Sequence, residues 1–112
     1  MTATQEFLQM DRQATLIRLA TLTEAFNNLV AASEGSNADD EHDPEGTTIA
    51  YERSQLDALA QQARAHLMSI DAALHRLAEG NYGTCEVCKQ PIPSERLQAR
   101  PTAVRCVTCS SS

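Results

Sequence analysis

Apolar residues recur along the first third of the chain with the spacing of a long amphipathic helix. They follow one another at alternating steps of three and four, with one poor member, Arg12: Leu8, Arg12, Thr15, Leu19, Leu22, Phe26 and Leu29. Such steps keep one stripe of a helix facing a partner helix, and Leu16, Ile17 and Val30 widen that stripe. We therefore expect a helix over residues 2–34 that stops at Gly35, since glycine adopts the left-handed conformation past a helix end without strain.

A second and clearer stripe runs from residue 44 to residue 79. Its members repeat every seven residues, with small or aliphatic residues at intermediate positions: Ile49, Leu56, Ala60, Ala63, Leu67, Ile70, Leu74 and Leu77. Asp43 can accept hydrogen bonds from the free N–H groups of a helix start, and Pro44 suits the first helical position because it has no N–H to leave unpaired. Gly80 is a favourable stop, so the pattern predicts a helix over residues 44–79.

Two long helices joined by a short polar loop favour one arrangement. At ~1.5 Å per residue, each arm is on the order of 50 Å long, and the chain folds back on itself to bury both stripes. We expect a mainly α protein with two domains. Residues 1–79 form an antiparallel two-helix coiled-coil hairpin with a tip loop at about residues 35–46, and residues 80–112 form a C-terminal module. We expect a monomer.

Acidic residues are concentrated at the expected tip. The chain has 112 residues and a net charge of −6, and one segment without Lys or Arg holds six carboxylates: Glu34, Asp39, Asp40, Glu41, Asp43 and Glu45. The rest of the chain therefore sums to zero. Such a chain lacks the basic face that DNA phosphates demand, so we expect no direct DNA contact. No segment approaches the ~20 apolar residues of a membrane span, and the N-terminus lacks a signal pattern, so we expect a cytoplasmic protein.

All four cysteines lie in the last third of the chain. They form two Cys-x2-Cys pairs, Cys85 with Cys88 and Cys106 with Cys109, separated by seventeen residues. Each spacing lets one tight turn aim both sulfurs at one point, and two such turns complete the tetrahedral thiolate set of Zn²⁺. Four cysteines fill four positions, so we expect one structural zinc and a zinc-finger module. A pair of disulfides is the alternative, and it is disfavoured because nothing marks the chain as secreted.

The segment between the two pairs is basic. Two prolines disfavour a regular strand there, and Ser94 can begin a helical turn through Leu97 that Pro101 keeps short. The arginines can either pair with Glu86, Glu95 and the zinc thiolates or form a surface for a partner. The charged residues of the segment sum to +3: Lys89, Glu95, Arg96, Arg100 and Arg105.

Residues of this module and of the tip resemble the DksA/TraR zinc-finger family. The matching stretches are Gly80-Asn81-Tyr82-Gly83-Thr84-Cys85-Glu86-Val87-Cys88, Ile92, Arg96-Leu97-Gln98-Ala99-Arg100-Pro101-Thr102-Ala103 and Cys106-Val107-Thr108-Cys109. Upstream, the hairpin length and the loop from Asp40 to Pro44 are similar to the coiled-coil tip of that family.

This resemblance implies a regulator of bacterial transcription that does not contact DNA. Family members bind RNA polymerase and insert the coiled coil into its secondary channel, where the tip acts near the active site and alters initiation complexes. Asp40 and Asp43 match the acids of the tip. Arg100 matches an arginine that helps to bind the alarmone ppGpp, and Arg96 is a further candidate for polymerase or nucleotide contact. The implied protein is not an enzyme, and no catalytic motif is found in the sequence.

The chain departs from the family pattern at four places. After Asp43-Pro44 it has Glu45-Gly46-Thr47-Thr48, where the family often has Ala-Asp-Arg-Ala. The two lysines of the family's ppGpp site align with Ser69 and Ser110, and each lost cation weakens phosphate binding by roughly 1 kcal/mol. We therefore expect little ppGpp response. The family's helix after the last cysteine is absent too, so we expect a smaller polymerase-contacting base.

Two other functions fit the same residues. One is a zinc-ribbon and coiled-coil adaptor that recruits another protein. Binding to RNA polymerase would distinguish the transcription regulator from this adaptor. The other is a transcript-cleavage factor, in which Asp40 and Asp43 share a Mg²⁺. Two flexible carboxylates hold Mg²⁺ weakly without substrate phosphates, so we rank cleavage below modulation.

Overall fold

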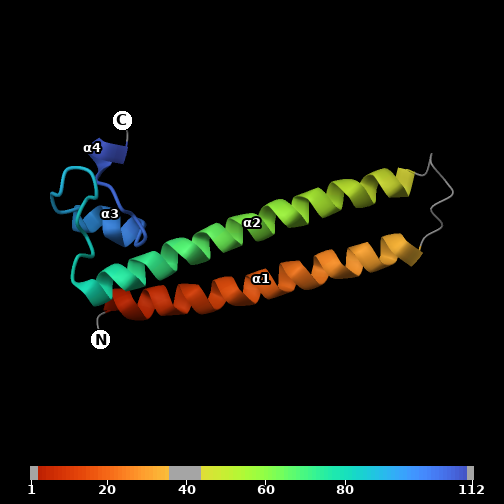
Figure 1. The fold of residues 1–112 in the computed structure, drawn as a ribbon, viewed down its shortest axis with the longest axis horizontal. Helices are drawn as coiled ribbons and strands as arrows, with labels where there is room; N and C mark the ends of the chain where they lie inside the picture. Colours follow the sequence, from red (N-terminus) through yellow and green to blue (C-terminus); the bar gives the residue numbers. More distant parts are fainter. Residues whose placement is uncertain (1–2, 36–43, 111–112) are drawn as a thin grey trace. The chain divides into compact units, whose positions relative to one another are not determined.

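The computed structural model describes residues 3–35 and 44–110, and the side chains of residues 34–35 and 44–47 lie outside that description. The predicted tip residues Asp40 and Asp43 also lie outside the described residues. Among those described, the chain forms helices α1 (Ala3–Gly35), α2 (Pro44–Glu79), α3 (Ser94–Ala99) and α4 (Val107–Ser110), drawn in Figure 1. The two long helices agree with the predicted bounds to within one residue at each end.

Contacts divide the chain into two compact units. The first unit joins Met1–Gln13 with Leu67–Ser112, and the second is Ala14–His66. In each unit a segment of α1 lies antiparallel beside a segment of α2 (Figure 1). The predicted two-helix hairpin with a C-terminal cysteine module is thus confirmed, while the predicted domain boundary between residues 79 and 80 stays a prediction.

The core of the first unit is small and lies on the predicted stripes. Leu8 and Ile70 are fully buried with Ala73, and Leu74, Leu77 and Tyr82 pack against this cluster. Beside the core, Arg12 Nε donates a hydrogen bond of 2.6 Å to Asp71 Oδ1. This ion pair explains how a charged residue is accommodated at a stripe position of α1.

The second unit is joined by small side chains. The buried residues in the described part of this unit are Thr15, Ala60 and Ala63, each 5–6% exposed. All three occupy predicted stripe positions. Near the other end of the unit, the Arg53 guanidinium lies 5.7 Å above the Phe26 ring, a cation–π contact between α2 and α1. Ile17, which was predicted to widen the stripe, is 59% exposed, so that prediction is wrong.

Local chemistry fixes the end of α2. Gly80 has φ +83°. Its N–H donates to the Leu77 carbonyl, and the N–H of Asn81 donates to the Arg76 carbonyl at 3.0 Å. This is the Schellman arrangement, which satisfies carbonyls at the end of a helix and requires a residue that tolerates positive φ.

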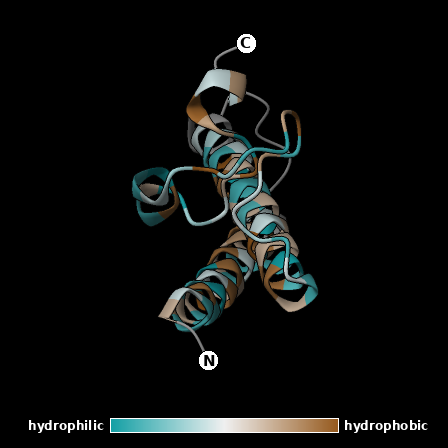
Figure 2. Ribbon diagram, turned by 90° about the vertical axis from the view of Figure 1, so that its left-hand side faces the viewer, coloured by the Kyte–Doolittle hydropathy of each residue, from teal (hydrophilic) through white to brown (hydrophobic). Residues whose placement is uncertain are grey.

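Figure 2 shows that both long helices carry hydrophilic as well as hydrophobic residues, as expected of amphipathic helices. Within residues 3–35 and 44–110, no helix combines the length and the apolar character that crossing a membrane requires.

Candidate metal centre

The first cysteine loop (residues 85–88) is the tip of a tight backbone turn. The Cys85 N–H donates to the Gln90 carbonyl at 2.9 Å, and the Lys89 N–H returns to the Cys85 carbonyl at 3.0 Å. Thr84 and Pro91 form an isolated antiparallel bridge, and no longer strand is found in the described part of the chain. These bonds make the loop double back at once, so both of its sulfurs face one side of the turn.

Lys89 takes the residue after Cys88 through a left-handed conformation, with φ +64°. Its ammonium group donates to the Glu86 carbonyl at 2.9 Å, a bond at the surface that stabilises the turn. A lysine is unusual at positive φ, and nothing in the sequence pattern indicated it.

The second cysteine loop (residues 106–109) is built on a short helix. Its last three positions lie in α4, and the Ser110 N–H donates to the Cys106 carbonyl at 2.9 Å. The α3 helix between the loops begins at Ser94, as predicted, and continues to Ala99 just before Pro101.

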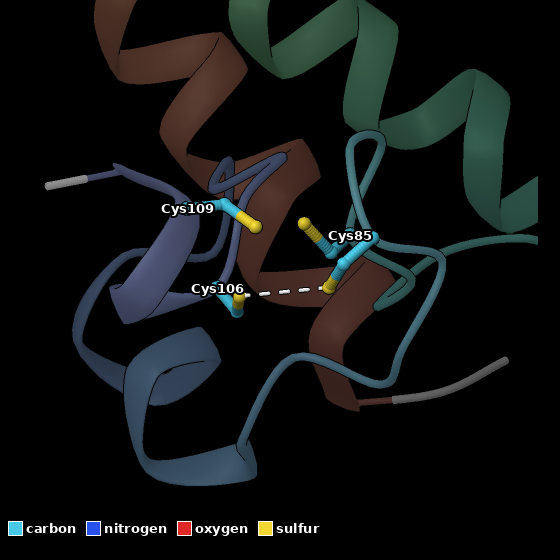
Figure 3. Close-up of side chains that lie close together, drawn as sticks. Cys85, Cys106 and Cys109 are labelled. Carbon is cyan, nitrogen blue, oxygen red and sulfur yellow. Dashed lines mark hydrogen bonds between the residues drawn. The ribbon is translucent and has the colours of Figure 1, made fainter. Parts of the chain in front are cut away.

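The four sulfurs converge on one point. The four Sγ atoms all lie within 4.8 Å of one another, and the Sγ atoms of Cys88 and Cys106 are 3.8 Å apart. Figure 3 shows the side chains of Cys85, Cys106 and Cys109 directed toward a common centre. All four cysteines are free rather than disulfide-bonded, and Cys85 is fully buried whereas Cys88 is exposed. The predicted ligands are therefore together.

The electrostatics of the cluster suit a divalent cation. Backbone N–H groups of Cys88 and Cys106 point at the Cys85 sulfur and lower the pKa of Cys85 to about 6. In contrast, hydrogen bonding with the sulfur of Cys106 raises the pKa of Cys109 to about 12. Because Zn²⁺ binds thiolates, metal binding releases the protons that the four thiols still hold. Four thiolates at this spacing fit Zn²⁺, which cross-links the two loops as a closed structural site.

The arginines between the loops divide into two groups. Arg105 Nε donates to Glu86 Oε1 at 2.9 Å, and Arg96 Nε donates to the Arg105 carbonyl at 2.8 Å. Arg100 is exposed, and its guanidinium has no hydrogen-bond or ion-pair partner among the residues that the structure describes. The sequence left internal pairing and a partner surface as alternatives, and the geometry gives internal pairing to Arg96 and Arg105.

A half-buried tyrosine connects this module to the end of α2, and nothing in the sequence beyond the family motif indicates this role. Tyr82 Oη donates to the Pro101 carbonyl at 2.8 Å, and burial raises the pKa of the Tyr82 phenol although the nearby Arg76 lowers it. Gly83, at φ +85°, brings its backbone close to Leu97 on α3. The motif residues around the cysteines therefore position α3 against the first cysteine loop.

Fold and site together define a helical hairpin protein with a four-cysteine zinc finger. Residues 80–111 match the prokaryotic dksA/traR C4-type zinc finger. The structure is similar to transcription factor DksA2 from Pseudomonas aeruginosa, with a TM-score of 0.81 and 28% identity, covering 96% of this chain and 78% of that one. It is also similar to the solution structure of DnaK suppressor protein from Agrobacterium tumefaciens C58, with a TM-score of 0.60 and 32% identity, covering 97% and 89%.

Sequence relatives agree with this assignment. Over 44 residues, which are 39% of this chain and 31% of the relative, the chain is 48% identical to the RNA polymerase-binding transcription factor DksA of Caulobacter vibrioides. The chain spans between 31% and 43% of the length of the first three curated relatives that it matches. The chain belongs to the DksA/TraR family of zinc-finger proteins.

Proposed function

We propose that this chain binds bacterial RNA polymerase and modulates transcription initiation without contacting DNA. The observation that carries the proposal is the similarity to DksA2, which extends over 96% of the chain and so includes the hairpin as well as the zinc finger. A likeness confined to the zinc finger would equally favour an adaptor, because four-cysteine modules serve many partners.

The hairpin acts as a lever that enters the secondary channel of the polymerase. Six carboxylates and no Lys or Arg lie within residues 33–46, which in sequence link the first long helix to the second. Clustered like charges repel one another and destabilise the compact state, which favours a use at a target. In the proposal, Asp40 and Asp43 act near the polymerase active site, and the protein itself performs no catalysis.

The zinc finger serves as the base that docks on the polymerase. Directly after α3, the exposed Arg100 guanidinium is available for a polymerase or nucleotide contact, whereas Arg96, on α3, is engaged within the module. With serine at positions 69 and 110, the response to ppGpp is small. The protein works in the cytoplasm as a monomer.

Transcription by purified polymerase tests this function at the tip. The zinc-loaded protein is expected to change the amount of initiated transcript at responsive promoters. Asp40→Asn and Asp43→Asn should keep polymerase binding and lose that effect, while Asp39→Asn, which removes a carboxylate from the same loop, is the matched control. If both tip variants change the amount of initiated transcript as much as the wild-type protein does, the proposed role of the tip is wrong. Mg²⁺-dependent shortening of nascent RNA in a stalled complex would favour the cleavage alternative.

A further inference from the structure

Glu86 connects the two cysteine loops without using a sulfur. It lies between Cys85 and Cys88, and its backbone N–H donates to the Val104 carbonyl at 2.9 Å. Its carboxylate accepts the 2.9 Å bond from Arg105, the residue that precedes Cys106. One residue of the first loop therefore holds two positions directly before the second loop.

The same connection reaches α3. Arg96 Nε donates to the Arg105 carbonyl at 2.8 Å, and the Arg96 carbonyl accepts from the Arg100 N–H at 2.7 Å. We call Glu86, Arg105 and Arg96 the clasp. Its three members come from the first cysteine loop, the approach to the second loop, and the helix between them. It can therefore keep the two cysteine loops and α3 in place even when a sulfur is not bound to the metal.

Two physical effects connect the clasp with zinc, and they differ in sign for Glu86. Holding the loops together lowers the entropy that must be lost when both bind one metal, so the clasp favours zinc. Four thiolates around one Zn²⁺ carry about −2, so a nearby arginine favours the bound metal and a nearby carboxylate opposes it. Removing Glu86 therefore weakens zinc binding if the clasp matters, and strengthens it if local charge alone matters.

We propose that the clasp is a retention device for the zinc, in which Glu86, Arg105 and Arg96 are positioning residues that slow metal loss. The inference concerns the metal site alone and does not rest on polymerase binding. It assigns Arg96 to the metal site, in place of the partner contact that the sequence suggested. The Arg105 and Glu86 side chains are 47% and 51% exposed, so the effect is moderate rather than all-or-none.

Zinc transfer from the loaded full-length protein to the chromophoric chelator 4-(2-pyridylazo)resorcinol, under reducing conditions, measures this retention. Glu86→Gln should speed zinc loss about two- to fivefold, the range of an exposed ion pair. Arg105→Gln should speed it further, because a cation is lost as well. Arg100→Gln removes the same charge outside the clasp and should change the rate less than twofold. Unchanged or slower loss from Glu86→Gln would overturn the inference.

Two further measurements separate the clasp from misfolding. The absorption bands of the Co²⁺-loaded variants should match those of the wild type, because the four sulfur ligands are untouched. The exchanged pair Glu86→Arg with Arg105→Glu should lose zinc more slowly than Glu86→Arg alone, since it restores an ion pair between the loops. An exchanged pair that loses zinc as fast as Glu86→Arg would contradict the clasp even if the single variants folded poorly.

Discussion

Tyr82 and Pro101, nineteen residues apart, are joined by a 2.8 Å hydrogen bond from the tyrosine hydroxyl to the proline carbonyl. Tyr82 also packs against the buried cluster of Leu8, Ile70 and Ala73. One side chain thus contacts the helical core of the first unit with its ring and the segment that follows α3 with its hydroxyl. This relationship attaches the zinc finger to the hairpin within that unit.

Removing the hydroxyl should weaken the attachment. Tyr82→Phe keeps the ring in the core and leaves the half-buried Pro101 carbonyl without its donor, at a cost of about 1 kcal/mol. Thermal unfolding of the zinc-loaded protein should show a midpoint lower by roughly 4–8 °C for a domain of this size. Tyr51→Phe is the control, because Tyr51 is 65% exposed and its loss of a hydroxyl should not move the midpoint. Equal midpoints for both variants would mean that the bond stabilises nothing.

Gly83 should tolerate a methyl group less well than Gly80. Both glycines have φ near +85°, so alanine at either costs about 1 kcal/mol of backbone strain. A Cβ at Gly83 would also lie 3.3 Å from Leu97 Cδ1, whereas a Cβ at Gly80 meets nothing within 4 Å. In urea unfolding, Gly83→Ala should therefore have a lower free energy of unfolding than Gly80→Ala. The reverse order would contradict the close packing of α3 on this turn.

Much of the fold could be predicted from the sequence because the signals are periodic or stereochemical. Apolar steps of three and four located both long helices, and the cysteine spacing located the metal site. Arg12 is the poor member of its stripe, and no pattern in one helix indicates that Asp71 on the other helix pairs with it. Ile17 was misassigned because apolar character alone does not say which edge of a wide stripe faces the partner helix.

The site was less predictable beyond its ligands. The hydrogen bond of Tyr82 depends on a residue nineteen positions away that the fold brings near, so the local sequence pattern does not indicate it. The positive φ of Lys89 arises within the first cysteine loop, but a lysine, unlike a glycine, does not signal positive φ in a sequence. For the arginines, the sequence offered two roles of equal weight. The structure distinguishes them by their hydrogen bonds. Arg105 donates to Glu86 and Arg96 donates to the Arg105 carbonyl, whereas Arg100 is exposed.

Truncating the core of the first unit should be costly. Ile70 is fully buried, so Ile70→Ala leaves a cavity beside Leu8 and Ala73 and should lower the free energy of unfolding by about 2–4 kcal/mol. Ile17→Ala makes the same chemical change at a residue that is 59% exposed, and should cost under about 0.5 kcal/mol. Chemical denaturation of both variants, followed by circular dichroism, checks the difference. Similar costs would place Ile70 outside the core.

Removing zinc should unfold the zinc finger and spare most of the helix content. The α3 and α4 helices hold 6 and 4 residues, against 33 and 36 in α1 and α2, so far-ultraviolet circular dichroism should change little on chelation. Amide NMR signals of residues 83–110 should collapse toward random-coil positions, while those of residues 48–66 persist. Collapse of the entire spectrum would mean that the metal supports both units, and an unchanged spectrum would mean that it supports neither.

If this chain acts on RNA polymerase through its hairpin, it must compete for the secondary channel, and a binding experiment shows whether it does. Zinc-loaded protein and core RNA polymerase are titrated in the presence of a protein already known to occupy the secondary channel. We expect saturable binding and mutual displacement, because both proteins need one channel. Absence of binding, or simultaneous binding of both proteins, would exclude the channel as the binding site and favour the adaptor function.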